Sequence, residues 1–249
     1  MKAIAKLAIG CLFSMAGLYA HAQQEVPVLP VDIFACNYAN GSDRADLNRA
    51  FGEFNSWADS NGITNLSIYL LTPSYYSDDF EYDFIGLNIW EDGASFGGGS
   101  GAMSGDPDSL EPFEGVVDCS SHALYALVGI KPPVEEPVSG GLFEFSNCTM
   151  KGNRSNDEGV AAVTAASEFF SQWNLNDAHA ALFNIAGLAS DTSYQFKWVT
   201  YYPSWQTWGS LFDHMVNEGG VQTLGAMLDP VMQCDSSRMY ETSVMRMPD

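Results

Sequence analysis

Positive charge is scarce in this chain of 249 residues. Lysine and arginine together number 10, against 31 aspartates and glutamates, which gives a net charge of −21. A protein that binds nucleic acid needs a patch of cations to neutralise phosphates, and so few cations spread along the chain cannot form one. The same shortage disfavours binding to anionic membrane surfaces. Nucleic acids are therefore excluded as partners.

Motifs for nucleophilic or metal-dependent catalysis are absent as well. The sequence contains no G-x-S-x-G, no H-E-x-x-H and no Walker-type glycine loop, and its histidines number only 4. Zinc ligands usually come in short C-x₂₋₄-C steps, which are also absent. The acidic clusters do not match a twelve-residue calcium loop. We expect no metal and no cofactor, and whether the protein is an enzyme stays open at this point.

Long apolar runs are confined to the start of the chain. Residues 1–22 carry a lysine at the beginning, continue with apolar residues and end in Ala-His-Ala, which is the layout of a secretory signal peptide. A lipoprotein cysteine at Cys11 is the alternative, but the apolar run before it is short. No later run approaches the roughly 20 residues of a membrane span. We expect an exported protein, periplasmic or extracellular, without a membrane span.

What the chain does contain is enough apolar surface for a core. Hydrophobic residues make up 46% of it and aromatic residues 13%, while only 16% of the residues are charged. This composition is typical of a globular protein and not of a disordered or fibrous one. The strongly acidic balance favours solubility and discourages association with other acidic surfaces.

Four cysteines follow the signal peptide, and their spacing repeats. The separation of Cys36 from Cys119 is nearly the same as that of Cys148 from Cys234. The shift that places Cys36 on Cys148, called the repeat offset below, also superimposes several aromatic residues of the two halves. Self-similarity at a fixed offset predicts duplication of a unit of about 100 residues. We expect a first unit at 23–131, a linker rich in proline and glycine at 132–141, and a second unit at 142–249.

Each unit shows the β-α-β-β-α-β pattern of a ferredoxin-like fold, with strand-like runs separated by helical periodicity. The second helix of the first unit departs from this plan, because glycines dominate residues 97–101 and each glycine inside a helix costs about 1 kcal/mol relative to alanine. We expect that helix to be short or loose. The expected strands lie at 31–35, 66–71, 82–90 and 122–130 in the first unit, and at 142–145, 180–188, 194–202 and 239–245 in the second.

The ferredoxin-like topology gives the cysteines a role. In such a unit the first and last strands are antiparallel neighbours, so the end of one lies beside the beginning of the other, and the cysteines stand at those two places. We expect two structural disulfides, Cys36–Cys119 and Cys148–Cys234, formed in an oxidising compartment. Each would close most of its unit into one long loop, worth about 4 kcal/mol in the chain-entropy account. A metal site is the alternative, which the spacing disfavours.

The element order, the duplication and the aromatic-glycine pair Trp208-Gly209, with a weaker counterpart at Phe96-Gly97, resemble the dimeric α/β-barrel superfamily. The resemblance covers most of residues 31–247. It implies an α+β fold in which two tandem ferredoxin-like units pack sheet to sheet as one intrachain α/β barrel. Members of the superfamily include cofactor-free monooxygenases, haem enzymes and small-molecule sensors, so the resemblance alone selects no function.

Aromatic residues gather between positions 194 and 208, and they are candidates for a ligand pocket. Strand alternation sends Trp198 and Tyr202 to one face, where part of the cluster is expected to line a cavity between sheet and helix. Core packing alone is the alternative. The candidate pocket residues are Trp90, Trp198, Tyr202, Trp205, Trp208 and His214.

Three histidines remain after the signal peptide. His214 is the first choice for the axial ligand that a haem protein would need, although the helical wheel turns it away from the apolar face. We expect His122 to be partly buried and hydrogen-bonded in a strand, and His179 to lie at the surface before a strand.

Our first interpretation is an exported, disulfide-stabilised protein without a conventional catalytic constellation, which binds a small apolar ligand or a protein partner. The alternative is a cofactor-free monooxygenase or a haem-dependent enzyme that works in the barrel cavity. A third interpretation is an assembly or adhesion module.

Overall fold

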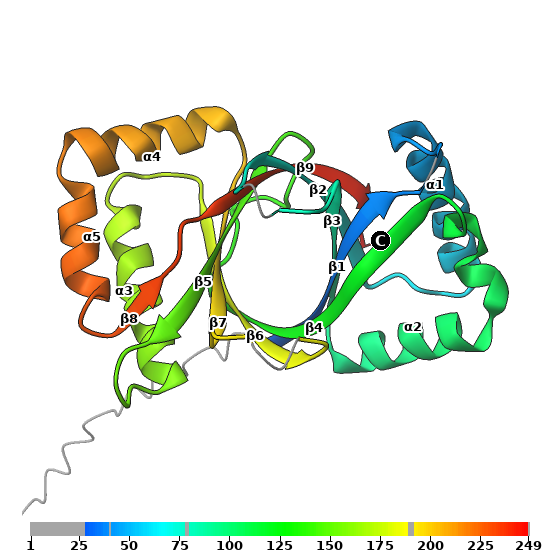
Figure 1. Ribbon diagram of the computed structural model, residues 1–249, viewed down its shortest axis with the longest axis horizontal. Coiled ribbons are helices and arrows are strands. Elements are labelled where there is room, and N and C mark those ends of the chain that lie inside the picture. Colours follow the sequence, from blue (N-terminus) through cyan, green and yellow to red (C-terminus); the bar gives the residue numbers. More distant parts are fainter. Residues whose placement is uncertain (1–27, 40, 78–79, 189–191, 249) are drawn as a thin grey trace, which may run out of the picture.

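The chain folds into a β-barrel flanked by helices, seen down the barrel in the computed structural model of Figure 1. The structure describes residues 28–39, 41–77, 80–188 and 192–248, so the predicted signal peptide lies outside the described residues. The first half contains β1 (Val28–Tyr38), α1 (Arg44–Ser60), β2 (Leu66–Tyr75), β3 (Phe84–Trp90), α2 (Gly93–Gly105), two 3₁₀ turns (Pro107–Ser109 and Glu111–Phe113) and β4 (Val117–Lys131). The second half contains β5 (Leu142–Met150), α3 (Asn156–Ser171), β6 (Ala178–Ala186), β7 (Phe196–Tyr202), α4 (Trp205–Asn217), α5 (Gly220–Leu228), β8 (Met232–Cys234) and β9 (Arg238–Arg246).

Eight antiparallel strands close the barrel in the order β7-β6-β4-β1-β3-β2-β9-β5, and β5 pairs with β7 to complete the ring. The short strand β8 adds to β5 outside this ring. The two halves hydrogen-bond edge to edge through β4–β6 and β2–β9, so the barrel is one continuous sheet. In Figure 1, α1 and α2 cover one side of the barrel and α3, α4 and α5 cover the opposite side. The α+β barrel expected from the sequence is confirmed.

Side chains fill the barrel interior. Successive residues of a strand point to opposite faces, so alternate residues of every strand meet inside the ring. Aromatic rings from the second half pack against one another there, with 5.1 Å between the ring centroids of Phe143 and Tyr201. The interior is therefore a packed core to which both halves contribute. Its buried residues are Val31, Tyr69, Leu71, Leu87, Ala123, Tyr125, Phe143, Phe145, Ala178, Leu182, Val199, Tyr201 and Tyr240.

The repeat offset of the sequence is also an offset of the structure. The helices α2 and α4 have 13 residues each, and the strands β3 and β7 have 7 residues each, with bounds separated by that offset. Capping boxes begin α1 at Asp43 and α3 at Ser155, two positions that the same offset relates. The local signals that start and stop elements therefore recur along the chain. Helix α5 follows α4 in the second half, and the second cysteine of each pair is displaced by slightly more than the repeat offset.

The prediction of a short or loose second helix in the first half is wrong, because α2 runs over all 13 residues. Gly99 explains why glycine is favourable there. A Cβ atom added at Gly99 would lie 2.3 Å from the indole ring of Trp90, so only glycine lets the helix lie directly on that ring. Packing of α2 on Trp90, through Gly99 and Phe96, thus outweighs the low helix propensity of glycine.

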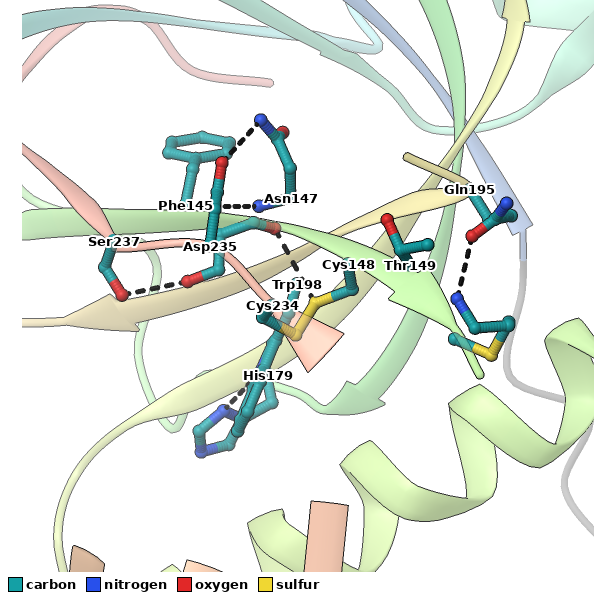
Figure 2. Close-up of a disulfide and its surroundings, with 12 residues drawn as sticks. Phe145, Asn147, Cys148, Thr149, His179, Gln195, Trp198, Cys234, Asp235 and Ser237 are labelled. Atoms are coloured by element: carbon teal, nitrogen blue, oxygen red, sulfur yellow. Dashed lines mark hydrogen bonds between the residues drawn. A yellow bond between two sulfur atoms is a disulfide. The ribbon is translucent and has the colours of Figure 1, made fainter. Parts of the chain in front are cut away.

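Both expected disulfides are present. Cys36–Cys119 joins paired residues of β1 and β4, and Cys148–Cys234 joins paired residues of β5 and β8. Figure 2 shows the second disulfide, next to which Asp235 accepts hydrogen bonds from the backbone and side-chain nitrogens of Asn147. Each bridge fastens the last part of a half to its first strand, as the expected topology requires.

Candidate functional site

A cavity of about 220 Å³ lies in the second half, between the outward face of β5 and β7 and the helices α3, α4 and α5. Its walls are mostly apolar or aromatic, and its polar groups come from the strands and from the segment between β8 and β9. The apolar and aromatic walls are Phe170, Trp198, Tyr202, Trp208, Leu211, Phe212, Met215 and Leu224, and the polar groups are Glu144, Ser146, Thr200 and Ser237.

Strand alternation and helix periodicity place these side chains together. Trp198, Thr200 and Tyr202 are alternate residues of β7 and therefore share its outward face. Ser146 pairs directly with Trp198, and Glu144 pairs with Thr200, so the polar side chains of β5 lie beside the aromatic ones of β7. On the other side, one face of α4 contributes residues at helical spacing, among them Trp208, Leu211 and Met215.

Glu144 is the charged group of the cavity. Its Oε2 accepts a hydrogen bond from the hydroxyl of Tyr202 at 2.9 Å. Burial, together with the negative charge of Glu144, raises the pKa of Tyr202 well above its ordinary value, so the phenol stays protonated and donates. Across the described ranges, no lysine, arginine or histidine forms an ion pair with Glu144. The hydroxyl oxygens of Ser146 and Ser237 lie 2.8 Å apart at the same side of the cavity.

A sealed polar network lies behind the cavity wall. His179 is fully buried, and its Nε2 lies 2.5 Å from Oδ2 of Asp177. Its Nδ1 lies 3.3 Å from Nε1 of Trp198 and 3.2 Å from Oγ1 of Thr200; Figure 2 shows the contact with Trp198. An indole N–H can only donate, so Nδ1 accepts and Nε2 carries the proton. These contacts hold the imidazole ring between Asp177 and the side chains of β7.

Asp177 is held by two partners. Burial raises the pKa of this carboxyl group, but hydrogen bonds from His179 and Lys131 outweigh that effect and leave the pKa lowered. Lys131 comes from the end of β4, so the ion pair also joins the first half to the second. The prediction that His179 lies at the surface is wrong. The strand β6 begins at Ala178, earlier than expected, and its alternation turns His179 under α3 beside Phe170.

The structure brings together half of the predicted pocket residues. Trp198, Tyr202 and Trp208 line the cavity. Trp205 stands one turn earlier on α4, where it touches Trp208 but is 39% exposed and outside the cavity. His214 also lies outside, because its Nδ1 is bonded to Glu218 and its ring stacks on Trp173.

Trp90, the remaining candidate, belongs to the first half. It lines a separate cavity of about 310 Å³, formed chiefly by the loop at residues 61–65 and small residues of α2. Trp90 is the one aromatic wall of that cavity, so the cavity offers a ligand few apolar contacts. The indole Nε1 donates to Asp32, which also contacts Nε2 of His122 at 3.0 Å. His122 is hydrogen-bonded in β4 as expected, but its side chain is 57% exposed.

Four polar residues of the cavity were not among the sequence candidates: Glu144, Ser146, Thr200 and Ser237. A signal for Glu144 exists in the sequence, because a carboxylate interrupts the apolar run of residues 142–145 and stands at the repeat offset from Asp32. The two serines give no comparable signal, since serine is common on any strand.

Comparison with known proteins bears on the fold. No family description and no curated protein sequence matches the chain. Solved structures do match, among them a protein provisionally assigned as a chlorite dismutase (TM-score 0.53, 9% identity, 88% of this chain and 96% of that chain), a protein provisionally assigned as a monooxygenase from Lactobacillus acidophilus NCFM (0.55, 10%, 88% and 95%), and a variant of chlorite dismutase from Candidatus Nitrospira defluvii (0.52, 5%, 86% and 90%).

These likenesses define the class of structure. The chain has the dimeric α/β-barrel fold found in proteins of the chlorite dismutase and monooxygenase type, with the whole barrel formed by a single chain. At such low identities the likeness shows the fold alone, and function has to be argued from the residues of the site.

Proposed function

We propose that this protein binds a small, largely apolar ligand in the second-half cavity. The observation that carries the proposal is the composition of the walls, which combine aromatic and aliphatic side chains with a few polar groups on one side. Pockets of this kind provide burial through the apolar walls and orientation through the polar groups. At about 220 Å³ the cavity is smaller than the roughly 300–1,000 Å³ of pockets for drug-sized ligands, so the ligand is small.

Filling the cavity tests this proposal. Trp198 and Trp208 line the cavity, so their fluorescence should change when a panel of small aromatic and aliphatic compounds is titrated. Leu211→Trp places a bulky ring in the cavity and should abolish the response. Trp205→Phe changes an exposed residue outside the cavity and should leave affinity unchanged. If no compound of a broad panel is bound by the wild type, in calorimetry as well as fluorescence, the proposal is wrong.

We further propose that the two halves are ferredoxin-like units that arose by duplication, with the boundaries 23–131, 132–141 and 142–249. The strand order supports this interpretation, because β4-β1-β3-β2 in the first half corresponds to β9-β5-β7-β6 in the second. The common offset of helices, strands and caps supports it as well.

Export to the periplasm or the extracellular medium is part of the same proposal. Two disulfides support it, because such bonds persist in oxidising compartments. Within the described ranges, no helix combines the length and the apolar character needed to cross a bilayer. Cell fractionation with N-terminal sequencing of the mature protein would test both export and the cleavage site after residue 22.

Catalysis is the second candidate function, and the observation that favours it is the fold shared with monooxygenase-type proteins. The residues do not fit a haem bound through histidine. Neither His122, His179 nor His214, the histidines of the described chain, lines the cavity. A haem is also larger than a drug-sized ligand, whereas this cavity is smaller than pockets for such ligands. A cofactor-free oxygenase would consume oxygen in the presence of its substrate, which an oxygen electrode detects.

A further inference from the structure

The region of the second-half cavity has an equivalent region in the first half, formed by the corresponding strands. The repeat offset places Asp32 on Glu144 and Trp90 on Tyr202. In both halves the carboxylate of the first strand accepts a hydrogen bond from the aromatic residue that ends the third strand. The Nε1···Oδ2 distance is 3.1 Å in the first half. The corresponding hydroxyl-to-Oε2 distance in the second half is 2.9 Å.

Large side chains occupy the first half at the place where the second half is hollow. Phe34 pairs with Gly86 on one neighbouring strand and with His122 on the other. The rings of Phe34 and His122 stack at a centroid distance of 4.0 Å. At the equivalent positions the second half has Ser146 and Ser237, and these two hydroxyl groups leave room beside the carboxylate.

Among the described residues, the second half also has no cationic side chain beside Glu144 that corresponds to His122 beside Asp32. In the first half, Asp32 contacts His122, a side chain that can carry a positive charge. In the second half, the described residues supply Glu144 with one hydrogen bond, donated by the neutral hydroxyl of Tyr202 to Oε2. Glu144 is half-buried, and a carboxylate facing an apolar cavity is costly unless it is paired. The cavity thus contains a negative charge without its balancing cation.

The walls of the cavity also favour a cation. Phe170, Trp198 and Trp208 line the same cavity as Glu144, and the faces of aromatic rings attract ammonium groups. Phe170 and Trp198 are stacked nearly parallel, with an interplanar angle of 15°. A positive head group can therefore contact the carboxylate and aromatic surface at once, while the aliphatic side chains of α4 and α5 accept an apolar body.

We propose that the ligand is a small organic cation, an alkyl- or arylalkylammonium ion, whose charged head takes the place beside Glu144 that His122 takes beside Asp32. The inference rests on the proposed function, since it names the class of ligand for that cavity. Ser146 and Ser237 leave the space for the head group, and Glu144 supplies the charge that selects it.

Two matched pairs of probes test the inference: choline against 3,3-dimethylbutan-1-ol, and benzylamine against benzyl alcohol. Within each pair the shape is similar and only one compound is positively charged. Calorimetry should show at least about tenfold tighter binding of the charged compound. Glu144→Gln keeps the size of the side chain and should remove this preference without weakening the binding of the alcohols. Asp32→Asn, the matched change in the first half, should leave all four affinities unchanged.

Ser237→His provides an independent second variant. The introduced imidazole would pair with Glu144 as His122 pairs with Asp32, and it should weaken choline binding at least about tenfold. If the charged and neutral compounds bind equally and neither variant changes that ratio, the cation inference is overturned while the ligand-binding cavity stands. If neither these probes nor the wider panel binds to the wild type, the proposed function itself fails.

Discussion

The two halves place a carboxylate at the same position, and they use it differently. In the first half, Trp90 and His122 satisfy Asp32, and the stacked rings of Phe34 and His122 occupy the space beside it. In the second half, Glu144 keeps the aromatic partner, Tyr202, and faces a cavity. Repetition of a backbone plan therefore did not repeat a site. The site depends on the few positions at which large and small residues were exchanged.

Volume is distributed differently between neighbouring strands of the two halves. In the first half the large residue Phe34 faces Gly86, and in the second half the small residue Ser146 faces Trp198. The helices that cover these strands also differ in side-chain size. Gly99 lets α2 lie on Trp90, whereas α4 has Leu211 at the equivalent position. Each half keeps a close packing of its own, and only the second leaves space for a ligand with apolar walls around it.

The largest effect expected in this comparison concerns two carboxylate–histidine pairs, one with a buried histidine (His179) and one with an exposed histidine (His122). Asp177→Ala leaves His179 and Lys131 without their buried partner and should cost about 3–5 kcal/mol of unfolding free energy. Asp32→Ala breaks hydrogen bonds to Trp90 and to the exposed His122, and it should cost about 1–2 kcal/mol. Urea unfolding of both variants measures the difference. An equal cost for the two variants would show that burial does not separate the pairs.

Substitutions at two glycines of α2 test how closely this helix packs on Trp90. Gly99→Ala forces a methyl group against Trp90 and should destabilise the protein by about 1–3 kcal/mol. Gly97 has no neighbour within 4 Å of an added Cβ atom, so Gly97→Ala should stabilise the helix by about 0.5–1 kcal/mol. Thermal unfolding gives both values. Stabilisation by both substitutions would mean that α2 does not need close contact with Trp90.

In the second half, acid should act through Asp177. The pKa of Asp177 in the folded protein lies below its ordinary value of 3.8, so the unfolded chain binds a proton there more readily. The stability that Asp177 contributes is complete above pH 3.8 and is lost as the pH falls through the folded value. Asp177→Asn should flatten the acid limb of the stability curve. If the curve of Asp177→Asn keeps the acid slope of the wild-type curve, the assignment to Asp177 is wrong.

The last comparison concerns the inner face of the barrel, where Lys197 occupies the position of Ile85 in the first half. Burial, with a smaller contribution from Arg238, lowers the pKa of Lys197 to about 8. Its ammonium group donates to Asn147 and lies over the ring of Tyr194. As for Asp177, the unfolded chain binds the proton more tightly than the folded protein does. The origin differs, because the charged form of Asp177 is stabilised by its partners, whereas the charged form of Lys197 is penalised by burial.

Stability should therefore rise with pH between about 8 and the ordinary lysine value of 10.5, as the folded protein releases this proton first. Lys197→Ile introduces the first-half residue and should remove this rise. Unfolding curves of the wild type and the variant, measured across this range, isolate the contribution of the lysine. A rise of the same size in both proteins would assign the effect to other groups.

Much of the fold could be predicted from the sequence, and less of the site. The barrel was expected from the resemblance to the dimeric α/β-barrel superfamily, and the cysteine pairs and the element order follow from spacing and periodicity, which act over short stretches or fixed offsets. The length of α2 did not, because the advantage of Gly99 exists only when Trp90 lies against it. The burial of His179 was missed because β6 starts at Ala178, earlier than expected, and so includes this residue in the sheet beneath α3.

The sequence by itself determined which cysteines pair, where helices begin at capping residues, and that the second half follows the plan of the first. These features depend on neighbours along the chain or on one repeated spacing. Only the tertiary structure decided that Glu144 faces a cavity while Asp32 does not. Free volume is what remains after side chains from β5, β7, the β8–β9 segment and three helices have packed together, and no single stretch of sequence contains that sum.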